Sequence, residues 1–507
     1  MRCDLPDCLT GLNRWQAALV LFAAGSLMAL GFAPFHLWPV IFVSLPVLYL
    51  LLINSESRGQ TIWRGFYFGY GYFMAGTWWI ANALLVDAEK FGWLLPFCVF
   101  GLSAVMALWF MVFGLLVHVC RAPMTVLRFA ALWVLVEYLR TFGQFGFPWN
   151  LLGYVGLASL PFAQMASVVG TYGLGFILAL VGLLPVCWLR PIPGYRKVMT
   201  TVVGILILVI CYFYGAVQLR QPIELADTMV RVVQPNVPQA VKGTREGRDV
   251  SLKALGYLTA RQPEGRAPDV TVWPETAYPF AVQVKEEQPL PPVKLLLTGA
   301  LRVEGVRPKM QLWNSVLAMD GKGRVLASYD KHQLVPFGEF VPLRSVLPLD
   351  KITPGETDFS RGVGPRTVTV AGIPPFSPLV CYEAIFPWMA VDSNARPAWF
   401  LNVTNDAWYG VSPGPYQHLD MARMRAIEQG LPLVRAANNG VSVMTDGRGR
   451  VLQRIELNQS GLFDALLPAA LQPTVYGRIG ECLPLLIIIL VFVCSIFTDS
   501  AGRKINK

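Results

Sequence analysis

The chain has 507 residues, of which 54% are hydrophobic and only 15% are charged, and its mean hydropathy is +0.47. Soluble domains carry roughly 25% charged residues, so this composition excludes an ordinary soluble protein and indicates a membrane protein. The formal net charge is +10. Because no clustered basic patch accompanies this charge, the sequence does not predict a nucleic-acid partner.

Seven apolar segments precede about residue 217, and each approaches or exceeds the ~20 residues that cross a bilayer core. With an eighth near the C-terminus, the candidate spans are roughly residues 15–33, 37–53, 66–85, 92–119, 122–139, 161–189, 198–217 and 480–498. The first is interpreted as a retained helix rather than a cleaved signal peptide, because six further spans follow it before about residue 217. We therefore predict a membrane domain of seven transmembrane helices over residues 1–217, a globular domain over 218–476, and an eighth helix with a tail over 477–507.

Lysine and arginine residues in short loops indicate the orientation of the spans. If the N-terminus is cytoplasmic, the short outer loops hold only Lys90 and Arg140. The inner loops and the C-terminal tail then hold Arg2, Arg14, Arg58, Arg64, Arg121, Arg190, Arg196, Lys197, Arg503, Lys504 and Lys507. This asymmetry predicts that both termini are cytoplasmic and that the globular domain lies outside the cytoplasm.

One cysteine stands apart from the other eight. Cys381, in the stretch LVCYEAIFP, is the only cysteine in the predicted globular domain. Outer compartments oxidise thiols to disulfides, and this domain contains no second cysteine to pair with it. Two interpretations follow: a buried thiol that packs as a small hydrophobic residue, or a thiol kept for its reactivity.

The globular domain shows the pattern of an α/β fold. Short apolar stretches typical of strands are VRVVQPN, DVTVWPE, KLLLTGAL, SVLAMD, RVLASYD, SPLVCYE, AWFLNVTND, LVRAANN and VSVMTD. The stretch QHLDMARMRAIEQGL has helical spacing, with Leu419, Ala422 and Ala426 on one face.

Two stretches of this domain echo each other, SVLAMDGKGRVL and SVMTDGRGRVL, and each reads as strand, turn, strand. We expect the pairs Asp320-Gly321 and Asp446-Gly447 to supply the positive φ angles that hairpin turns favour. The echo predicts a layered α/β sandwich with two related halves.

Three predicted strand ends carry reactive side chains: Glu275 in VTVWPETAYP, Lys331 in SYDKHQLVPFGEF, and Cys381 in LVCYE. Loops at strand ends are common positions for catalytic residues. A thiol nucleophile needs a base, and a carboxylate in a low-dielectric pocket can serve. It also needs a positive group to stabilise the thiolate and the oxyanion. Glu, Lys and Cys together therefore form a sufficient set for acyl transfer.

The motifs WPETA, YDKHQLVPFGEFVP and CYE resemble the Glu-Lys-Cys motifs of the nitrilase superfamily, whose fold is an α-β-β-α sandwich. Within it, the chain is identified as a member of the apolipoprotein N-acyltransferase family, and the resemblance covers nearly the whole chain. The further features that carry it are the eight spans, the domain between spans seven and eight, the segment TNDAWYGVSPGPYQHLDMARMRAIE, the pair Asn438-Asn439 and the loop GFPWN.

The resemblance implies that an acyl chain moves from the sn-1 position of a membrane glycerophospholipid to the free α-amine of a diacylglyceryl-cysteine at an apolipoprotein N-terminus. It implies Cys381 as the nucleophile that forms a thioester, Glu275 as the general base, and Lys331 as the stabiliser of the thiolate and the oxyanion. Such a covalent route is expected to show ping-pong kinetics. No metal-ligand cluster is visible in the sequence, and no cofactor is implied. The implied location is the bacterial inner membrane, with a periplasmic catalytic domain.

The resemblance also implies supporting residues, namely Glu339, Glu383, Tyr382 and Asn314. We expect the two glutamates to orient Lys331 and to balance charge; the alternative is a loop salt bridge. Tyr382 is expected to hold the loop of the nucleophile, and its backbone N–H to aid the oxyanion.

Several aromatic residues are candidates for lipid contact: Trp408, Phe147, Trp149, Phe337 and Phe340. The alternative for Trp408 is a core residue, and for Phe147 and Trp149 it is anchoring at the membrane interface. The loop after Lys331 is too apolar for a solvated loop, so we expect it to dip toward the bilayer or to gate the lipid entrance. Its apolar members are Phe337, Phe340, Val341, Leu343, Val346 and Leu347.

One departure from the family pattern follows VQPNVPQ. The family commonly has a Lys-Trp pair there, whereas this chain has Lys242-Gly243. This difference bears on how substrate binds, not on the reaction.

Three alternative functions are weighed against acyl transfer. A cysteine hydrolase would pair Cys381 with His418 and Asn438 or Asn439; on the acyl-transfer hypothesis, His418→Ala is expected to alter catalysis little. A transporter would place ionisable residues along a path within the spans, where the sequence offers few. A small-molecule amidase would leave the membrane helices without a purpose.

Overall fold

A computed structural model of the chain describes residues 9, 11–120, 124–143, 145–242, 244–263, 265–306, 310–342, 344, 350–353, 357–482, 485–486, 488–490 and 492–493. The chain folds into two compact units. The first comprises Met1–Ala81, Leu94–Arg220 and Val475–Lys507, and the second comprises Asn82–Trp93 and Gln221–Thr474.

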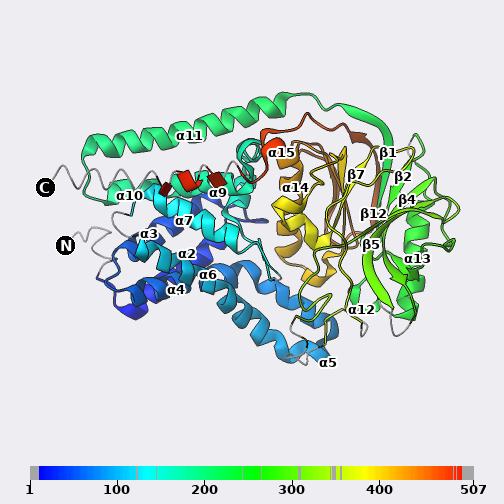
Figure 1. The fold of residues 1–507 in the computed structure, drawn as a ribbon, viewed down its shortest axis with the longest axis horizontal. Helices are drawn as coiled ribbons and strands as arrows, with labels where there is room; N and C mark the ends of the chain where they lie inside the picture. The colour runs from blue at the N-terminus through cyan, green and yellow to red at the C-terminus, as the bar shows by residue number, and fades with distance from the viewer. Residues whose placement is uncertain are drawn as a thin grey trace. The chain divides into compact units, whose positions relative to one another are not determined.

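The first unit is helical (Figure 1). Its helices are α2 (Arg14–Ala29), α3 (Ile41–Ile53), α4 (Arg58–Thr77), α6 (Leu102–Val119), α7 (Val126–Leu139), α8 (Leu160–Ala163), α9 (Ala166–Gly182), α10 (Leu184–Leu189), α11 (Gly194–Arg220) and α15 (Val475–Ile479). Glycines let several of them approach closely, as small residues do in membrane bundles. A Cβ atom at Gly25 of α2, for example, would lie 2.0 Å from the Phe68 carbonyl oxygen of α4.

Three helical stretches are long and apolar enough to cross a membrane: Phe97–Val119, Ala166–Leu189 and Gly194–Arg220. At 1.5 Å per residue, the 27 residues of α11 extend about 40 Å. Arg14–Ala29 and Trp38–Ile53 are apolar but shorter. The eighth predicted span, roughly residues 480–498, lies partly outside the described residues, so the count of eight stays a prediction.

The second unit contains two β-sheets. The strands of the first are, in spatial order, β12 (Gly461–Pro468), β1 (Leu225–Gln234), β2 (Val270–Val272), β4 (Leu295–Glu304), β5 (Gln311–Asp320) and β6 (Val325–Asp330), and β3 (Tyr278–Val282) pairs with β4. Those of the second are β11 (Val451–Ile455), β10 (Ser442–Thr445), β9 (Leu433–Ala437), β8 (Trp399–Thr404) and β7 (Phe376–Val380). The pairs β1–β2, β2–β4, β7–β8 and β8–β9 are parallel.

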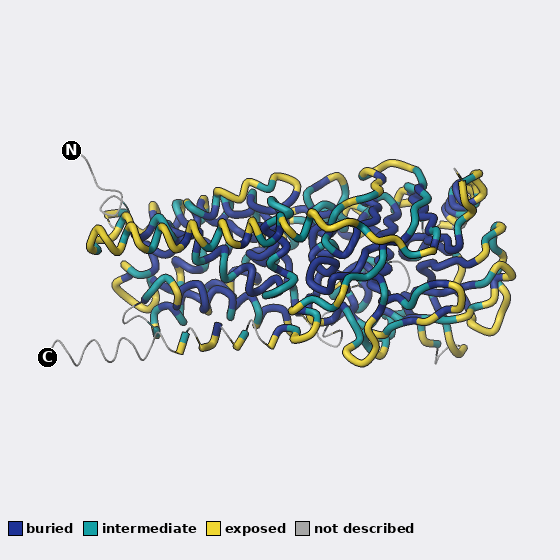
Figure 2. The backbone as a smooth tube through the Cα atoms, turned by 90° about the horizontal axis from the view of Figure 1, so that it is seen from above, coloured by how far each residue is buried: buried dark blue, intermediate teal, exposed yellow. Residues whose placement is uncertain are grey.

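The two sheets pack face to face, and helices cover their outer faces (Figure 1). One buried cluster joins side chains of both sheets, including Val232 and Leu297 from the first and Val380 and Leu401 from the second. A second cluster packs α13 (Arg245–Thr259) on the first sheet, and a third packs α14 (Gly414–Gln429) on the second. The core strands are dark blue and many of the loops between them are yellow in Figure 2. The predicted α-β-β-α sandwich is therefore confirmed.

Most predicted elements of this unit are confirmed. The nine predicted strand stretches overlap β1, β2, β4, β5, β6, β7, β8, β9 and β10, although β1, β4, β5 and β7 begin or end outside the predicted bounds. The predicted helix is α14, and its Leu419, Ala422 and Ala426 lie in the buried cluster against the second sheet. The pairing β5–β6 occurs in one sheet and β10–β11 in the other, so the sequence echo corresponds to equivalent hairpins in the two halves.

The turn geometry of these hairpins differs from the prediction. The residues with positive φ are Gly323 (80°) and Gly449 (74°), two positions after the expected glycines. In the first turn, one Asp320 carboxylate oxygen accepts hydrogen bonds from the backbone N–H groups of Lys322 and Arg324. In the second turn, one Asp446 carboxylate oxygen accepts hydrogen bonds from the backbone N–H groups of Arg448 and Arg450. The aspartate thereby organises a longer turn than the two-residue type that was expected.

A short segment of the predicted membrane domain belongs to the second unit. Asn82–Trp93, which includes α5 (Ala88–Phe91), groups with the sandwich. The side-chain amide of Asn82 donates to the Tyr409 carbonyl oxygen (2.7 Å), and the Lys90 ammonium lies 2.7 Å from the Asp350 carboxylate. These contacts join the segment to loops of the second unit.

We predict that Gly323→Ala lowers the free energy of unfolding by more than about 1 kcal/mol, because alanine is strained at positive φ. The new Cβ would also lie 1.8 Å from the Gln288 carbonyl oxygen. Gly256→Ala is the matched control, because this α13 position has open space around it and alanine favours helix. Thermal unfolding of the detergent-solubilised protein tests the pair; equal melting temperatures for the two variants would contradict the turn geometry.

Candidate active site

The three predicted reactive residues lie at or shortly after the ends of strands in the two sheets. Lys331 follows β6 in the first sheet and Cys381 follows β7 in the second, while Glu275 lies three residues after β2. All three are buried, with exposed fractions of 6% for Glu275, 1% for Lys331 and 6% for Cys381. Because the two sheets pack face to face, residues more than 100 positions apart in the sequence meet at one place.

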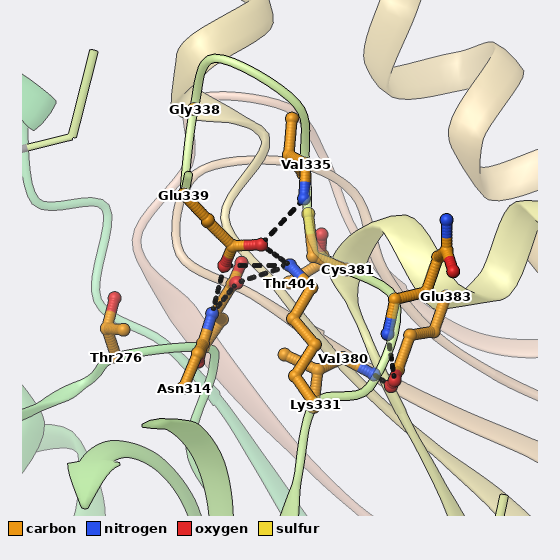
Figure 3. A network of polar contacts seen from close by, with 12 residues as sticks. Thr276, Asn314, Lys331, Val335, Gly338, Glu339, Val380, Cys381, Glu383 and Thr404 are labelled. Atoms are coloured by element: carbon orange, nitrogen blue, oxygen red, sulfur yellow. Dashed lines mark hydrogen bonds and ion pairs between the residues drawn. The ribbon is translucent and has the colours of Figure 1, made fainter. Parts of the chain in front are cut away.

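The Lys331 ammonium is held between two carboxylates (Figure 3). Its Nζ lies 3.0 Å from Glu339 and 3.7 Å from Glu275 Oε1. Burial by itself lowers the pKa of Lys331, but the charges of Glu339 and Glu275 outweigh it and raise the pKa above its ordinary value. Lys331 therefore stays positively charged inside the site.

Asn314 joins the two carboxylates. Its side-chain amide, on β5, donates to Glu275 Oε1 (2.7 Å) and to Glu339 Oε1 (2.8 Å). The backbone carbonyl oxygen of Asn314 accepts a hydrogen bond from the backbone N–H of Lys331 (2.9 Å). Asn314 thus contacts Glu275, Lys331 and Glu339 at once, and its supporting role in the reaction stays a prediction.

Cys381 lies at a sharp turn between β7 and a short 3-10 helix, Cys381–Ile385. Its φ angle is +49°, a conformation that costs a non-glycine residue on the order of 1–3 kcal/mol. Burial and the nearby Glu275 raise the pKa of the thiol, while Lys331 opposes this rise. The thiol is therefore protonated at rest, and it needs a base to become a nucleophile.

Glu383 braces the backbone on both sides of the site. One of its carboxylate oxygens accepts from the backbone N–H of Val380 (2.8 Å), and the other accepts from the backbone N–H of His332 (2.8 Å) and the Tyr329 hydroxyl (3.0 Å). Burial raises the pKa of Glu383, but His332 and the backbone donors lower it to a net value below the ordinary one. We expected Glu383 to orient Lys331; the structure shows that it holds the chain segments next to Lys331 and Cys381.

His418 faces the main chain of the nucleophile. Its Nε2 lies 3.0 Å from the Cys381 carbonyl oxygen, and its Nδ1 lies 2.8 Å from Asp406 Oδ1. Arg435 donates to the other Asp406 oxygen (2.6 Å). Burial raises the pKa of Asp406, but Arg435 and His418 lower it to about 2. Both ring nitrogens are thus directed at oxygen acceptors, so His418 supports the turn at Cys381.

Asn438 has a structural role as well. Its side chain accepts from the backbone N–H of Val237 and donates to the Val237 carbonyl oxygen and to Asn405. Asn439 contacts Asn458. The described contacts therefore do not assemble the Cys381–His418–Asn arrangement of the alternative hydrolase. Among the described residues there is also no group of three His, Cys, Asp or Glu side chains that could hold a metal ion.

The predicted residues around the nucleophile differ in exposure. Tyr382 is buried in the 3-10 helix after β7, with its ring 5.2 Å from that of Phe386. Trp408, in the short helix Asp406–Tyr409, is partly buried. Phe337 is 36% exposed, and Phe340 is partly buried with the Arg361 guanidinium over its ring. Lipid contact by these residues stays a prediction.

The loop that carries Phe337 and Phe340 is folded back on itself. Phe337 has a φ of +61°, and its backbone N–H donates to the Phe340 carbonyl oxygen (2.8 Å). Val341 is buried. Leu343, Val346 and Leu347 lie outside the described residues, so the expected gating role of this loop stays a prediction.

The aromatic pair of the GFPWN loop lies in the first unit. Trp149 is 1% exposed, stacks on Phe147 and has its ring 4.9 Å from that of Trp79. The Trp149 ring is packed inside the unit, so neither interfacial anchoring nor lipid contact by this side chain gains support, and its role stays a prediction. Phe147 is partly buried, and its contact with substrate stays a prediction.

Lys242 belongs to the site but was not predicted. Its Nζ donates to the Glu275 carbonyl oxygen (3.0 Å) and to Thr276 Oγ1 (3.1 Å). It lies at the end of a four-residue helix, α12 (Gln239–Lys242). A single lysine on so short a helix has no hydrophobic periodicity that would mark it as a site residue. Its only sequence signal is the alignment of Lys242-Gly243 with the Lys-Trp pair that is common in the family. Gly243, its neighbour, lies outside the described residues.

Comparison with known proteins extends over both units. A family model described as apolipoprotein N-acyltransferase N-terminal domain matches residues 24–184, and one described as carbon-nitrogen hydrolase matches residues 216–476. An apolipoprotein N-acyltransferase from Rhodopseudomonas palustris is 37% identical over 94% of this chain and 94% of that protein. Its counterpart from Bradyrhizobium diazoefficiens is 36% identical over 96% of each chain. Saccharomyces cerevisiae Nit3, a solved member of the nitrilase superfamily, aligns with 48% of this chain and 90% of that chain at 15% identity and a TM-score of 0.34.

We predict that Glu383→Gln lowers both the melting temperature and the rate of acyl transfer, the latter by at least about tenfold, which corresponds to about 1.4 kcal/mol. The amide removes an acceptor that buried donors need, and each unsatisfied buried donor costs about 1–3 kcal/mol. Glu286→Gln is the control, because Glu286 is exposed. Wild-type activity in Glu383→Gln would contradict the bracing role.

The placement of His418 changes the expectation for His418→Ala. Loss of the Nε2 contact with the Cys381 carbonyl should slow formation of an acyl-enzyme and lower the melting temperature, while acylation remains measurable. Time-resolved mass spectrometry of the acylated protein tests this. If a folded His418→Ala variant were as inactive as Cys381→Ala, the result would favour His418 as the base.

Proposed function

The chain belongs to the apolipoprotein N-acyltransferase family, and from this premise we propose that it moves a fatty acyl chain from the sn-1 position of a membrane glycerophospholipid to an apolipoprotein. The acceptor is the free α-amine of an N-terminal diacylglyceryl-cysteine, and the product is a triacylated lipoprotein. The observation that carries the mechanism is the geometry of the site: the Lys331 ammonium lies 3.7 Å from Glu275 Oε1, and Cys381 is buried with both residues. There the Glu275 carboxylate raises the pKa of the Cys381 thiol and the Lys331 ammonium lowers it.

In the first half-reaction, Glu275 accepts the proton of the Cys381 thiol as the sulfur attacks the ester carbonyl carbon. Lys331 stabilises the negative charge that develops on the carbonyl oxygen, as a preorganised cation does in a water-poor site. The bond between the carbonyl carbon and the glycerol oxygen then breaks. Glu275 returns the proton to that oxygen, so a lysophospholipid leaves and the acyl chain remains on Cys381 as a thioester.

In the second half-reaction, the neutral α-amine of the acceptor attacks the thioester carbonyl carbon. Glu275 accepts a proton from the attacking nitrogen, and Lys331 again faces the developing negative charge. The carbon–sulfur bond breaks, the sulfur regains the proton from Glu275, and an amide is formed. A thioester is activated toward amines, so this transfer needs no ATP, metal or other cofactor.

The contacts around Lys331 support this division of roles. Glu339 lies 3.0 Å from the Lys331 ammonium, so Lys331 keeps a carboxylate partner while Glu275 is protonated during the reaction. Asn314 donates to Glu275 Oε1, which orients this carboxylate. Burial of the site limits access of water, and this matters because water attack on the thioester would convert the enzyme into a phospholipase.

The membrane setting belongs to the same proposal. Three long apolar helices and lipid substrates favour a multi-pass protein of the bacterial inner membrane. The charge asymmetry of the loops favours eight spans, a periplasmic catalytic domain and two cytoplasmic termini. The amidase alternative is disfavoured because the relatives match the helical part of the chain as well as the sandwich.

Mass spectrometry of the purified protein mixed with phospholipid alone tests the covalent step. We predict a mass increase of one fatty-acyl chain on the Cys381 peptide, and loss of that adduct when a diacylated lipopeptide with a free amine is added. The expected reason is that the thioester forms without the acceptor and is then discharged by the amine.

The variants for this experiment are Cys381→Ala, which should form no adduct, and Glu275→Gln, which should reduce its rate by at least about a hundredfold, the scale of general base catalysis. Cys98→Ala is the control, because this cysteine lies in the first unit. Active wild-type protein that never carries the adduct would rule out the thioester route.

A further inference from the structure

We propose that Lys242 is a positioning residue for the base of the reaction: its ammonium holds the turn that carries Glu275 and thereby aims the Glu275 carboxylate at Cys381. This inference rests on the proposed function. It names a residue of α12 that acts through Glu275 and does not itself take part in bond formation.

The turn that carries Glu275 is strained. The backbone N–H of Ala277 donates to the Pro274 carbonyl oxygen (3.3 Å), so Glu275 and Thr276 are the two central residues of a tight turn. Thr276 has a φ of +45°. A β-branched residue avoids this region of backbone space, and the second central position of such a turn usually holds glycine. The turn therefore needs contacts from outside to keep its shape.

One such contact is the close approach of β4. A Cβ atom at Gly299 would lie 2.5 Å from the Glu275 Cα and 2.6 Å from the Thr276 nitrogen, so the turn rests directly on the bare backbone of Gly299. The backbone N–H of Gly299 also donates to the Pro274 carbonyl oxygen (3.1 Å). This side of the turn is fixed by steric contact.

Lys242 supplies the second contact. Its Nζ donates to the Glu275 carbonyl oxygen and to the Thr276 hydroxyl, and these oxygens belong to the two central residues of the turn. A cation bound to both makes charge-assisted hydrogen bonds, which are stronger than neutral ones. Loss of this cation would let the peptide between Glu275 and Thr276 rotate toward a less strained conformation and move the carboxylate away from Asn314 and Cys381.

The lysine is itself held in a fixed place. Gln239, at the start of α12, accepts a hydrogen bond from Asn405 (2.7 Å), just beyond the end of β8. At the other end, the Val241 carbonyl oxygen accepts from the backbone N–H and hydroxyl of Thr244. A Cβ at Gly247 would lie 1.7 Å from that same oxygen. Both ends of α12 are therefore tied to neighbouring elements, so Lys242 can transmit that fixed position to the turn.

The charge of Lys242 provides a signature of this role. Burial lowers the pKa of Lys242, the Glu275 carboxylate after β2 and, once ionised, the Cys381 thiolate after β7 oppose the shift, and the net pKa is about 8. Below this pH the side chain is an ammonium that can hold both oxygens. Above it, the neutral amine holds them less strongly, so acylation of Cys381 should slow as the pH rises through about 8.

The experiment measures only the first half-reaction. The acceptor lipopeptide is left out, because its α-amine also titrates in the pH range of the test. Full-length wild type, Lys242→Met, Lys242→Arg and the control Lys253→Met are mixed with phosphatidylethanolamine in detergent micelles. Lys253 is exposed on α13. The acylation rate is followed by mass spectrometry against phospholipid concentration and between pH 6 and 9.5.

We expect Lys242→Met to reduce the maximal acylation rate at least tenfold without changing the phospholipid concentration that gives half the maximal rate. Lys242→Arg should recover part of the rate and lose the decline above pH 8, because a guanidinium stays protonated there. Wild-type rates in Lys242→Met would overturn the proposal. The proposal would also be overturned if Lys242→Met lowered the melting temperature together with the acylation rate and Lys242→Arg recovered none of that rate, since this pattern indicates a structural role only.

A second readout separates this inference from the proposed function. If wild-type protein forms no acyl adduct, the proposed function fails, but alignment of Glu275 with Cys381 can still be measured by alkylation of the Cys381 peptide with iodoacetamide. The proposal predicts slower alkylation in Lys242→Met than in Lys253→Met. Equal alkylation rates in these two variants would overturn it.

Discussion

The Lys331 ammonium lies between two buried carboxylates, and the remaining parts of the site are arranged around this one charge. A buried charge that loses a partner typically destabilises a protein by about 3–5 kcal/mol, so Glu275, Glu339 and Lys331 constrain one another's positions. These contacts also fix the positions of strands relative to one another, because Glu275 follows β2, Asn314 lies in β5 and Lys331 follows β6 of the first sheet. Cys381 is then brought to this charge by the packing of the second sheet against the first.

Strained backbone occurs on both sides of the charge, at Cys381 and beside Glu275. Cys381 and Thr276 both have positive φ angles, and in each case a basic side chain contacts a carbonyl oxygen of the strained turn. His418 contacts the carbonyl of Cys381, and Lys242 contacts that of Glu275. The site is thus preorganised by elements that do not react, a common way to place catalytic groups in their productive geometry.

Much of the sandwich could be predicted from the sequence, because its buried strands are short apolar runs that end in recognisable turn or reactive residues. Glu275, Lys331 and Cys381 follow such runs directly or within a few residues, and so their meeting could be expected. The strands β3 and β12 were missed, since their burial does not follow a simple alternation. The positive φ angles at Gly323 and Gly449 were misplaced by two residues, because the aspartate side chains shape the turns.

Other features depend on contacts between distant residues and left no local signal. Lys242 reaches the site from α12, where the Gln239 side chain accepts a hydrogen bond from Asn405, just beyond the end of β8. The segment Asn82–Trp93 reads as the end of one apolar span and the start of the next, yet it groups with the sandwich. Trp149 was a candidate for lipid contact from its place in an apolar loop, but its ring is buried against Trp79.

The central claim is that Glu275 and Lys331 together make Cys381 reactive, and the pH dependence of its alkylation tests this most directly. The rate of iodoacetamide modification of the Cys381 peptide should be followed by mass spectrometry in wild type, Glu275→Gln and Lys331→Met. The account predicts that Lys331→Met moves the rise in modification rate to more alkaline pH than in wild type, because Lys331 lowers the pKa of a thiol that burial raises. Glu275→Gln should slow modification without this alkaline shift, because it removes the base together with a negative charge that raises the pKa of the thiol. The same pH profile in all three proteins would contradict it.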